Sequence, residues 1–394
     1  GAGLIGGAAA RHFAKAGHDV VLIGPPEPAD KRGHHGVFGS HYDEGRITRK
    51  LDPWAFWSRV SRESIARYAE IEAESGIAFY TEAGAMLAGP ADGALIRQTA
   101  EVQAAAGFPA ERLTGAALAE RFPYFAFSAD TLALYEATGA GHISPRRLAR
   151  AQQAAALRAG ARHLTVEAEG LEETGTAVRI ATAEGRVEAD RALVATGGFT
   201  DLLLPGALPL SVYARTVALF EIDAAEAARL SGMPSLIALL PNGEDPYLLP
   251  PIRYPDGRLY LKLGGDPVDV PLEGRAALGD WFRDGGSAEV GARLEAMIRE
   301  RMPGLAIRRT VTDACVTTYT PADRPAIGRL SSRVAVAVAG CGRGAKCSDE
   351  LGRLGGLAAL GEALPDWAER PDRRSRGQSA FRAECAAAMV PSSR

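Results

Sequence analysis

The sequence is poor in cysteine, in long apolar runs and in net charge, and each shortage excludes a class of protein. Its four cysteines, Cys315, Cys341, Cys347 and Cys385, show no C-x-x-C spacing, so we expect a cytoplasmic protein without structural disulfides. No apolar run reaches the roughly 18–20 residues of a membrane span and no signal peptide is visible, which argues against a membrane protein. The formal net charge of −3 gives no reason to expect a nucleic-acid partner.

Metal ligands at useful spacing are also missing. The seven histidines include His34, His35 and His41 in one glycine-rich loop, but no carboxylate or thiolate stands at metal-ligand spacing from them. We therefore expect no metal site. The length of 394 residues and the hydrophobic share of 46% are those of a globular protein that can hold two domains.

A dinucleotide-binding pattern opens the chain. Gly1, Gly3 and Gly6 form a G-x-G-x-x-G loop that leads into a predicted helix ending near Gly17, and the apolar strand 20–23 follows. Glycines at these positions let backbone N–H groups approach a pyrophosphate at the positive end of the helix. The alternative is a glycine-rich turn before an ordinary helix.

Two parts of that pattern are absent. The chain begins on the first glycine, without the strand that normally precedes the loop, and we interpret it as clipped at this point. Gly24 stands where an acid usually binds the adenosine ribose, and Glu27 is a candidate for that role.

Two further strands run into glycines. The strand 191–195 leads to Gly197, where a backbone can pass close to a dinucleotide, although the same residues also fit a simple turn. The strand 334–338 leads into a second glycine loop, with Gly340, Gly342 and Gly344, that also carries cations and precedes a helix.

Cys315 and a pair of arginines are the candidates for chemistry. A lone cysteine in an apolar stretch is usually a small buried hydrophobe, but this one shares the chain with two glycine loops. Arg46 and Arg49 follow a glycine-rich loop and suit a carboxylate or the negative charge of a reduced flavin. Paired arginines on a solvated surface are the alternative.

Four separated motifs resemble the flavin amine oxidases typified by monomeric sarcosine oxidase and N-methyltryptophan oxidase, within the D-amino acid oxidase fold superfamily. The first is the loop from Gly39 with Ser40 and His41 to the R-x-x-R pair, and the second is the segment 261–264 around Lys262. The third is the segment around Cys315, and the fourth is the glycine loop from Gly340 to Lys346. The resemblance covers residues 1 to about 360.

The resemblance implies an α/β fold with two parts. A discontinuous Rossmann-like FAD-binding domain of the glutathione-reductase type is expected over residues 1–80, 140–205 and 305–394. A substrate domain of α+β type, built on a mainly antiparallel sheet, is expected over residues 81–139 and 206–304. Within these parts, we predict helices over 54–75 and 144–159 and antiparallel strands over 213–222 and 236–263.

The resemblance also assigns roles. Cys315 would bind the flavin 8α carbon through a thioether, Arg46 would favour the anionic reduced flavin, and Lys262 would promote its reaction with oxygen. Arg49 and Lys346 would hold the substrate carboxylate. The expected FAD-binding set comprises Gly1, Gly3, Gly6, Ser40, His41, Arg46, Thr48, Gly197, Cys315, Gly340, Gly342, Gly344 and Lys346.

Three departures from the sarcosine enzymes concern the substrate. Asp266 and Arg343 each replace a histidine, and Thr317 replaces a tyrosine, so the cage for the methylammonium of sarcosine is not expected here. The implied reaction is hydride transfer from an N-methyl, cyclic or other amino acid to flavin N5. Oxygen would then reoxidise the flavin, giving hydrogen peroxide and an imine that hydrolyses.

Two alternatives remain open at this point, and a monomer is expected in each case. One is a dehydrogenase of the same fold that passes electrons to a quinone or a protein. The other is a flavin-binding protein without catalytic activity.

Overall fold

The computed structural model describes residues 1–369, and in them helices surround one large mixed sheet and several small sheets. The predicted α/β class is therefore confirmed. Cys385 and the arginine-rich sequence around 371–378 lie outside the described residues.

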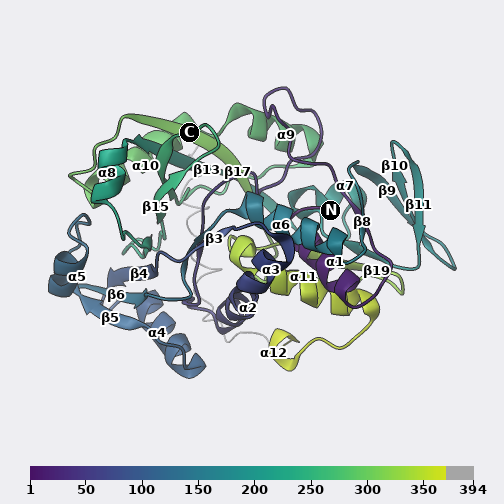
Figure 1. Cartoon of the computed structure of the whole chain (residues 1–394), viewed down its shortest axis with the longest axis horizontal. Helices are drawn as coiled ribbons and strands as arrows, with labels where there is room; N and C mark the ends of the chain where they lie inside the picture. The colour runs from purple at the N-terminus through teal and green to yellow at the C-terminus, as the bar shows by residue number, and fades with distance from the viewer. Residues whose placement is uncertain (370–394) are drawn as a thin grey trace, which may run out of the picture.

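Parallel strands and three packed helices form the part that contains both glycine loops. Helix α1 (Leu4–Lys15) follows the first loop, and β1 (Val21–Ile23) pairs in parallel with β8 (Arg162–Leu164). Strand β12 (Ala192–Val194) pairs in parallel with β19 (Val334–Val338), which also pairs with β18 (Ala326–Arg329). Helices α6 (Pro145–Arg158) and α11 (Gly344–Leu360) both pack on α1, and Figure 1 shows α1 in purple beside α11 in yellow.

Glycine explains the close approach of α11 to α1. A Cβ on Gly352 would lie 2.6 Å from the Cβ of Ala8 and 2.7 Å from the backbone nitrogen of Ala9. Such distances do not occur for real side chains, so this crossing requires glycine.

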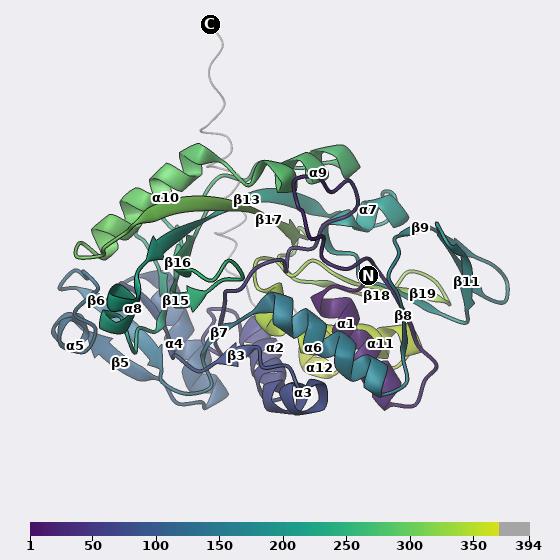
Figure 2. The same cartoon turned by 45° about the horizontal axis from the view of Figure 1, so that its top comes forward.

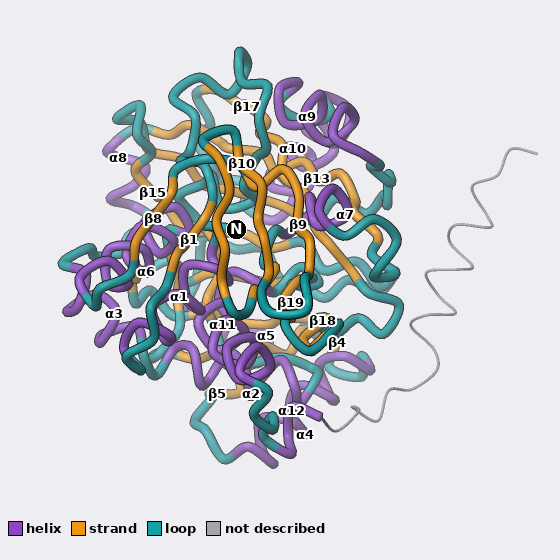
Figure 3. The backbone as a smooth tube through the Cα atoms, turned by 90° about the vertical axis from the view of Figure 1, so that its right-hand side faces the viewer, coloured by secondary structure: helices purple, strands orange, loops and turns teal. Residues whose placement is uncertain are grey.

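A separate antiparallel sheet lies beside these elements. It consists of β9 (Ala168–Glu173), β10 (Val178–Thr182) and β11 (Gly185–Ala189), and Figure 3 faces it. The short helices η1 (Gly197–Phe199) and α7 (Thr200–Leu203) follow β12.

The second part is an eight-stranded sheet with the order β17-β13-β16-β15-β14-β4-β6-β5. Its strands are β4 (Ala85–Pro90), β5 (Glu111–Thr114), β6 (Thr131–Glu136), β13 (Ser211–Ile222), β14 (Ser235–Ala238), β15 (Tyr247–Arg253), β16 (Leu259–Gly264) and β17 (Arg309–Tyr319). Helices α4 (Ala94–Ala106), α5 (Gly115–Arg121) and α8 (Ala224–Arg229) connect these strands.

Strand β17 lies in a different part of the molecule from the one expected for its residues. Residues from 305 onward were expected in the FAD-binding part, but β17 pairs with β13 along its whole length, from Arg309 to Tyr319. Eleven paired residues hold this strand in the large sheet. Cys315 therefore belongs to the same sheet as Lys262.

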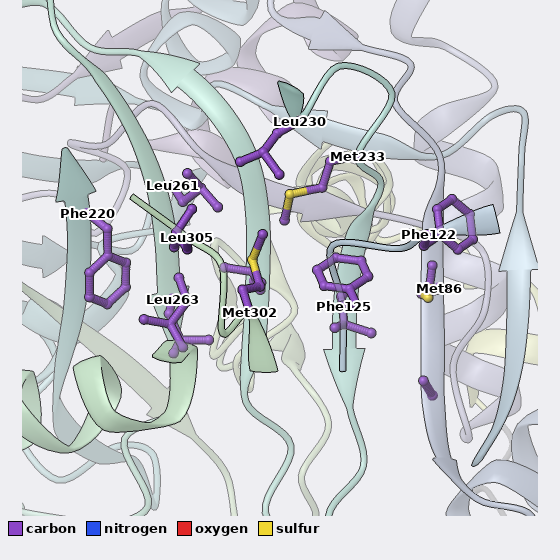
Figure 4. Packing of buried hydrophobic residues seen from close by; sticks show 14 of the residues in the cluster. Met86, Phe122, Phe125, Phe220, Leu230, Met233, Leu261, Leu263, Met302 and Leu305 are labelled. Carbon is purple, nitrogen blue, oxygen red and sulfur yellow. The ribbon is translucent and has the colours of Figure 1, made fainter. Parts of the chain in front are cut away.

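Helices cover one face of the large sheet. Helices α9 (Gly274–Asp284) and α10 (Ala288–Arg301) lie along β13 and β17, as Figure 2 shows. The largest hydrophobic cluster fills the space around this sheet, and Figure 4 shows part of it, including Phe122, Phe125, Phe220, Leu263 and Met302. The other face of the strands is left to the candidate site.

The predicted helix over 54–75 is two helices, α2 (Ala55–Ile65) and α3 (Tyr68–Ser75). Arg67 interrupts them and forms ion pairs with Asp349 and Glu350 of α11. The helix predicted over 144–159 is α6, and the side chain of Ser144 caps it by accepting a hydrogen bond from the backbone N–H of Arg147. The strands β2 (Arg46–Thr48), β7 (Gly141–Ile143) and β3 (Tyr80–Thr81) form a small sheet whose β2 contacts α11, and α12 (Asp366–Glu369) ends the described chain.

Residues 1–369 contain no helix with the length and apolar character needed to cross a membrane. In the same range, no group of three or more histidine, cysteine or acidic residues is arranged to hold a metal ion. The cysteines of this range, Cys315, Cys341 and Cys347, are free thiols.

Candidate active site

The two glycine loops line one cavity of about 280 Å³. The first loop tolerates no side chains at its key positions, because a Cβ on Gly6 would lie 1.7 Å from the carbonyl oxygen of Gly1. A Cβ on Gly1 would lie 2.5 Å from the carbonyl oxygen of Ala195, at the end of the strand that precedes Gly197. The close packing of the loop against β12 thus follows from the absence of side chains.

Most of the predicted cofactor-binding residues lie on the wall of this cavity. They are Gly1, Gly3, Ser40, His41, Arg46, Gly197, Cys315, Gly340, Gly342 and Gly344, and Thr317 joins them. Gly6, Thr48 and Lys346 are not on the wall. Thr48 is buried and its hydroxyl forms a 3.0 Å hydrogen bond with that of Tyr68.

The second glycine loop is strained where it meets the cavity. Ala339 and Cys341 have positive φ angles of 67° and 46°, which residues other than glycine rarely adopt. The backbone N–H of Cys341 donates to the carbonyl of Thr318 over 3.0 Å and so attaches the loop to β17. A Cβ on Gly340 would lie 2.6 Å from the Cα of Gly344, so glycine is also needed there.

Cys315 lies on the cavity wall with its thiol next to a cation. The guanidinium of Arg46 donates from Nη2 to Sγ of Cys315 over 3.2 Å. The strand is fixed from behind, because the indole of Trp281 on α9 donates to the carbonyl oxygen of Cys315 over 2.8 Å. Cys315 and Thr317 share one face of β17, since side chains alternate along a strand.

A buried carboxylate joins Arg46 to Lys262. Oδ2 of Asp43 accepts hydrogen bonds from Nη1 of Arg46 and from Nζ of Lys262. Nζ of Lys262 also donates to the carbonyl of Gly45 over 2.7 Å, and the side chain is fully buried. Glycine is needed at position 45, because a Cβ there would lie 2.8 Å from Cδ1 of Ile252.

Burial and neighbouring charges shift the pKa values of the residues in this group. Burial, together with the Arg46 cation, lowers the pKa of Lys262 to about 7. Burial alone would lower the pKa of Arg46, but charge interactions led by Cys315 raise it overall. His41 stays neutral at pH 7, because burial and the nearby arginines lower its pKa to about 4.

A second buried group contains the predicted carboxylate clamp. Oδ2 of Asp52 lies 3.4 Å from Nη1 of Arg49, 3.2 Å from Nε of Arg343 and 3.4 Å from Nζ of Lys346. Lys346 also donates to the hydroxyl of Ser61 on α2 over 2.6 Å. Arg49 and Lys346, which are far apart in the sequence, thus lie at one carboxylate, and their role as a substrate clamp stays a prediction.

Three cations sharing one carboxylate explain the shifts in this group. Burial would raise the pKa of Asp52, yet Arg343, Lys346 and Arg49 lower it to about 2. Burial lowers the pKa of Lys346 and of Arg49. The neighbouring cations Arg49 and Arg343 lower the pKa of Lys346 further. Nε of Arg49 is buried and has no hydrogen-bond partner among residues 1–369, so a donor remains free for an anion.

The three departures from the sarcosine enzymes lie in different places. Oγ1 of Thr317 is buried and lacks a hydrogen-bond partner within the described chain, and its residue lines the cavity. Arg343 lies in the Asp52 group, with its guanidinium 5.8 Å from the ring centre of Trp57. Asp266 is occupied by backbone amides, since it accepts from Thr216 and from Val268, each over 3.2 Å.

The missing ribose-binding acid has a structural explanation. A Cβ on Gly24 would lie 2.5 Å from the backbone nitrogen of Ala2, so the first loop leaves no room for a side chain there. Glu27 forms a two-pronged ion pair with Arg146, over 2.6 and 2.8 Å. Its carboxylate is therefore engaged by α6.

Sequence reasoning missed Asp43, Asp52 and Ser61. Each acid stands three residues from an arginine that was singled out, Asp43 before Arg46 and Asp52 after Arg49. That spacing was the available signal. Outside a helix, a spacing of three residues does not imply that two side chains meet, which is why it did not suggest an ion pair.

The cavity fits the FAD that the resemblance implies. Glycine cradles at 1–6 and 340–344 allow backbone N–H groups to face an anionic group at the starts of α1 and α11. The unpartnered hydroxyl of Thr317 and the half-buried thiol of Cys315 face the same space.

Comparison with known families agrees with this reading of the cavity. The family described as FAD dependent oxidoreductase matches residues 1–355. Monomeric sarcosine oxidase from Bacillus sp. is 27% identical over 382 residues, which cover 93% of this chain and 92% of that protein. N-methyl-L-tryptophan oxidase from Salmonella arizonae is 26% identical over 257 residues, covering 64% and 65% of the two chains.

Solved structures share the fold. NikD, described as an unusual amino acid oxidase essential for nikkomycin biosynthesis, superposes with a TM-score of 0.75 at 20% identity, over 95% of this chain and 97% of that one. L-proline dehydrogenase from P. horikoshii superposes with a TM-score of 0.71 at 19% identity, over 93% and 94%.

Proposed function

The chain belongs to the FAD dependent oxidoreductase family, and from this premise we propose that it oxidises the C–N bond of an amino acid with oxygen as the electron acceptor. The observation that carries the proposal is the convergence of Arg49 and Lys346 on one carboxylate oxygen in a buried place. Cations that share an internal carboxylate and keep a free donor suit a substrate carboxylate. The names of the sarcosine and N-methyltryptophan oxidases support the same class of substrate.

Arg49 and Lys346 would bind the substrate carboxylate in different ways. The planar fork of Arg49 orients the carboxylate, while Lys346 supplies a point charge held by Ser61. Holding the substrate at this end fixes the direction in which its amine and C–H bond point. Asp52 offsets the mutual repulsion of these cations and so holds them near one another.

FAD, when bound, supplies a two-electron acceptor for the hydride of the substrate. The amino acid would lose that hydride and a proton, and the resulting imine would react with water to give a carbonyl compound and an amine. Cys315 would hold the cofactor covalently, and Arg46 would position its sulfur through the hydrogen bond from Nη2. Lys262 would place a buried positive charge where oxygen takes up electrons.

The substrate would be an amino acid other than sarcosine. Arg343 adds a third cation to the clamp, and Thr317 presents a small hydroxyl to the cavity. Neither forms an aromatic cage for a methylammonium group. An N-methylated, cyclic or primary amino acid with a larger side chain is the proposed class.

A dehydrogenase is the second candidate, and the position of Lys262 favours it. The side chain of Lys262 is fully buried and is not part of the cavity wall, so its charge does not directly face the space in which oxygen would meet the flavin. Such an enzyme would pass its electrons to a quinone or a protein. Stopped-flow reoxidation of the photoreduced protein in air separates the two, because an oxidase reoxidises fast and Lys262→Met slows it at least tenfold.

Anaerobic mixing with a panel of N-methyl, cyclic and primary amino acids tests the substrate class. Bleaching of the flavin absorbance by one class identifies it, and Arg49→Lys should weaken the apparent binding of that substrate. A complete absence of bleaching would favour a flavin-binding protein without catalytic activity.

A further inference from the structure

Asp43 bonds both Arg46, the arginine next to Cys315, and Lys262, the lysine predicted to promote the reaction with oxygen. It stands on the loop before β2 and is buried. Oδ2 accepts from Arg46 and from Lys262. Oδ1 accepts from the hydroxyl of Tyr254 over 2.9 Å and from the backbone N–H of Glu44 over 2.7 Å. Both oxygens of the carboxylate are thus used, and its position is fixed from three directions.

The other charged or titratable groups around Lys262 do not replace Asp43. Arg46 of β2 repels the ammonium, and Cys315 of β17 is bound to that arginine. Asp313 of β17 is paired with Lys31 over 2.9 Å. The neighbours from the β15 region are the phenols Tyr247, whose ring centre lies 5.6 Å from Nζ, and Tyr254. Within residues 1–369, Asp43 is the only carboxylate that contacts Lys262.

We propose that Asp43 is a positioning residue that keeps Lys262 in its charged form and holds its ammonium in place beside the cavity. A buried lysine next to an arginine would otherwise lose its proton, because burial and a like charge both disfavour the charged form. Removing one partner of a buried ion pair leaves the charge of the other partner without an opposite charge beside it. That Lys262 serves the oxygen reaction rests on the proposed function, whereas its protonation by Asp43 does not.

The protonation of Lys262 can be measured without any enzyme assay. The chain contains only five lysines, Lys15, Lys31, Lys50, Lys262 and Lys346. The protein labelled with [ε-¹³C]lysine therefore gives few signals, and Lys262→Met identifies the one of interest. Its titration midpoint should lie near pH 7 in the unaltered protein and at least about one pH unit lower in Asp43→Asn, a tenfold change in the acid constant.

Lys346 provides an internal control in the same spectra. It is also buried, but its contacts are with Asp52 and Ser61, so Asp43→Asn should leave its titration unchanged. Tyr254→Phe removes one hydrogen bond to Asp43 without removing the charge, and it should move the Lys262 midpoint much less than Asp43→Asn. Asp43→Glu, which restores a carboxylate, should bring the midpoint back toward that of the unaltered protein. If Asp43→Asn does not fold, Asp43→Ser is measured in its place.

An unchanged Lys262 midpoint in a folded Asp43→Asn protein would overturn the proposal. Reoxidation of the photoreduced holoprotein supplies the second readout. At pH 7.5, Asp43→Asn should slow the reaction with oxygen by at least about eightfold, the loss of protonated Lys262 that a shift of one pH unit produces, with recovery at lower pH, and should add nothing in the Lys262→Met background. Should the unaltered protein itself reoxidise slowly, with no effect of Lys262→Met, the oxidase function fails while the NMR titration still decides the role of Asp43.

Discussion

The guanidinium of Arg46 lies 3.2 Å from the sulfur of Cys315, on the wall of the cavity that both glycine loops line. Of the other two cysteines of the described chain, Cys341 is fully buried on the wall of the same cavity, and Cys347 is buried next to Ser61. The contact therefore singles out one cysteine for covalent chemistry.

The first prediction concerns that cysteine. The denatured protein should carry yellow fluorescence on a gel, and Cys315→Ala should abolish it, because Cys315 is the thiol expected to form the thioether. Cys347→Ala is the matched control and should keep the fluorescent band, since its thiol contacts Ser61 rather than Arg46. Flavin that separates from the denatured native protein would contradict the covalent link.

The second prediction concerns the carboxylate clamp. Arg49→Lys keeps a positive charge but loses the planar fork and the free Nε, so substrate binding should weaken by about 10- to 100-fold, the range for a hydrogen bond to a charged group. Steady-state kinetics and anaerobic titration with the substrate measure the change. An equal loss for Arg32→Lys, an exposed arginine on the loop before the site, would show that the effect is not specific.

The third prediction concerns stability and pH. The pKa of Asp52 is lowered to about 2 by three cations, so its carboxylate stabilises the folded chain above the usual aspartate pKa of about 4. That contribution, about 2 kcal/mol, is lost as the pH falls from about 4 toward 2. Asp52→Asn should remove it at neutral pH and flatten this part of the pH dependence.

Urea unfolding at several pH values tests this expectation. Asp19→Asn is the control, because Asp19 forms only an exposed pair with Arg162 and should change stability by less than about 1 kcal/mol. If Asp52→Asn is as stable as the unaltered protein at pH 7, the three cations do not depend on Asp52.

The fourth prediction concerns the second glycine loop. Gly340→Ala would place a Cβ 2.6 Å from the backbone of Gly344, and the loop must shift at the cost of about 1–3 kcal/mol. We expect a lower melting temperature and a lower flavin content per chain. Gly328→Ala on β18 has no atom within 4 Å of the added Cβ, so it should retain both.

Local patterns allowed much of the fold to be predicted from the sequence. The strand 334–338 and the helices that follow the first glycines and Ser144 depend on neighbouring residues, and the structure contains them, although the first helix begins at Leu4, before Gly6. The convergence of Arg49 with Lys346 was available only through a resemblance, because residues such as Asp52 and Lys346, 294 positions apart, carry no local signal of contact.

Long-range pairing accounts for what the sequence did not reveal. Asp43 and Lys262 are separated by 219 positions and meet because β16 passes under the loop before β2. The place of β17 in the large sheet depends on its register with β13, and strand registers are settled by partners that a single sequence does not identify.

The position of β17 has a mechanical consequence. Cys315 belongs to the eight-stranded sheet, whereas the glycine loops begin helices that pack on the parallel strands. A flavin bonded to Cys315 and cradled by those loops would contact both parts of the molecule at once. Because the loops form this cradle only in the folded chain, the attached cofactor would stabilise the folded arrangement of the two parts.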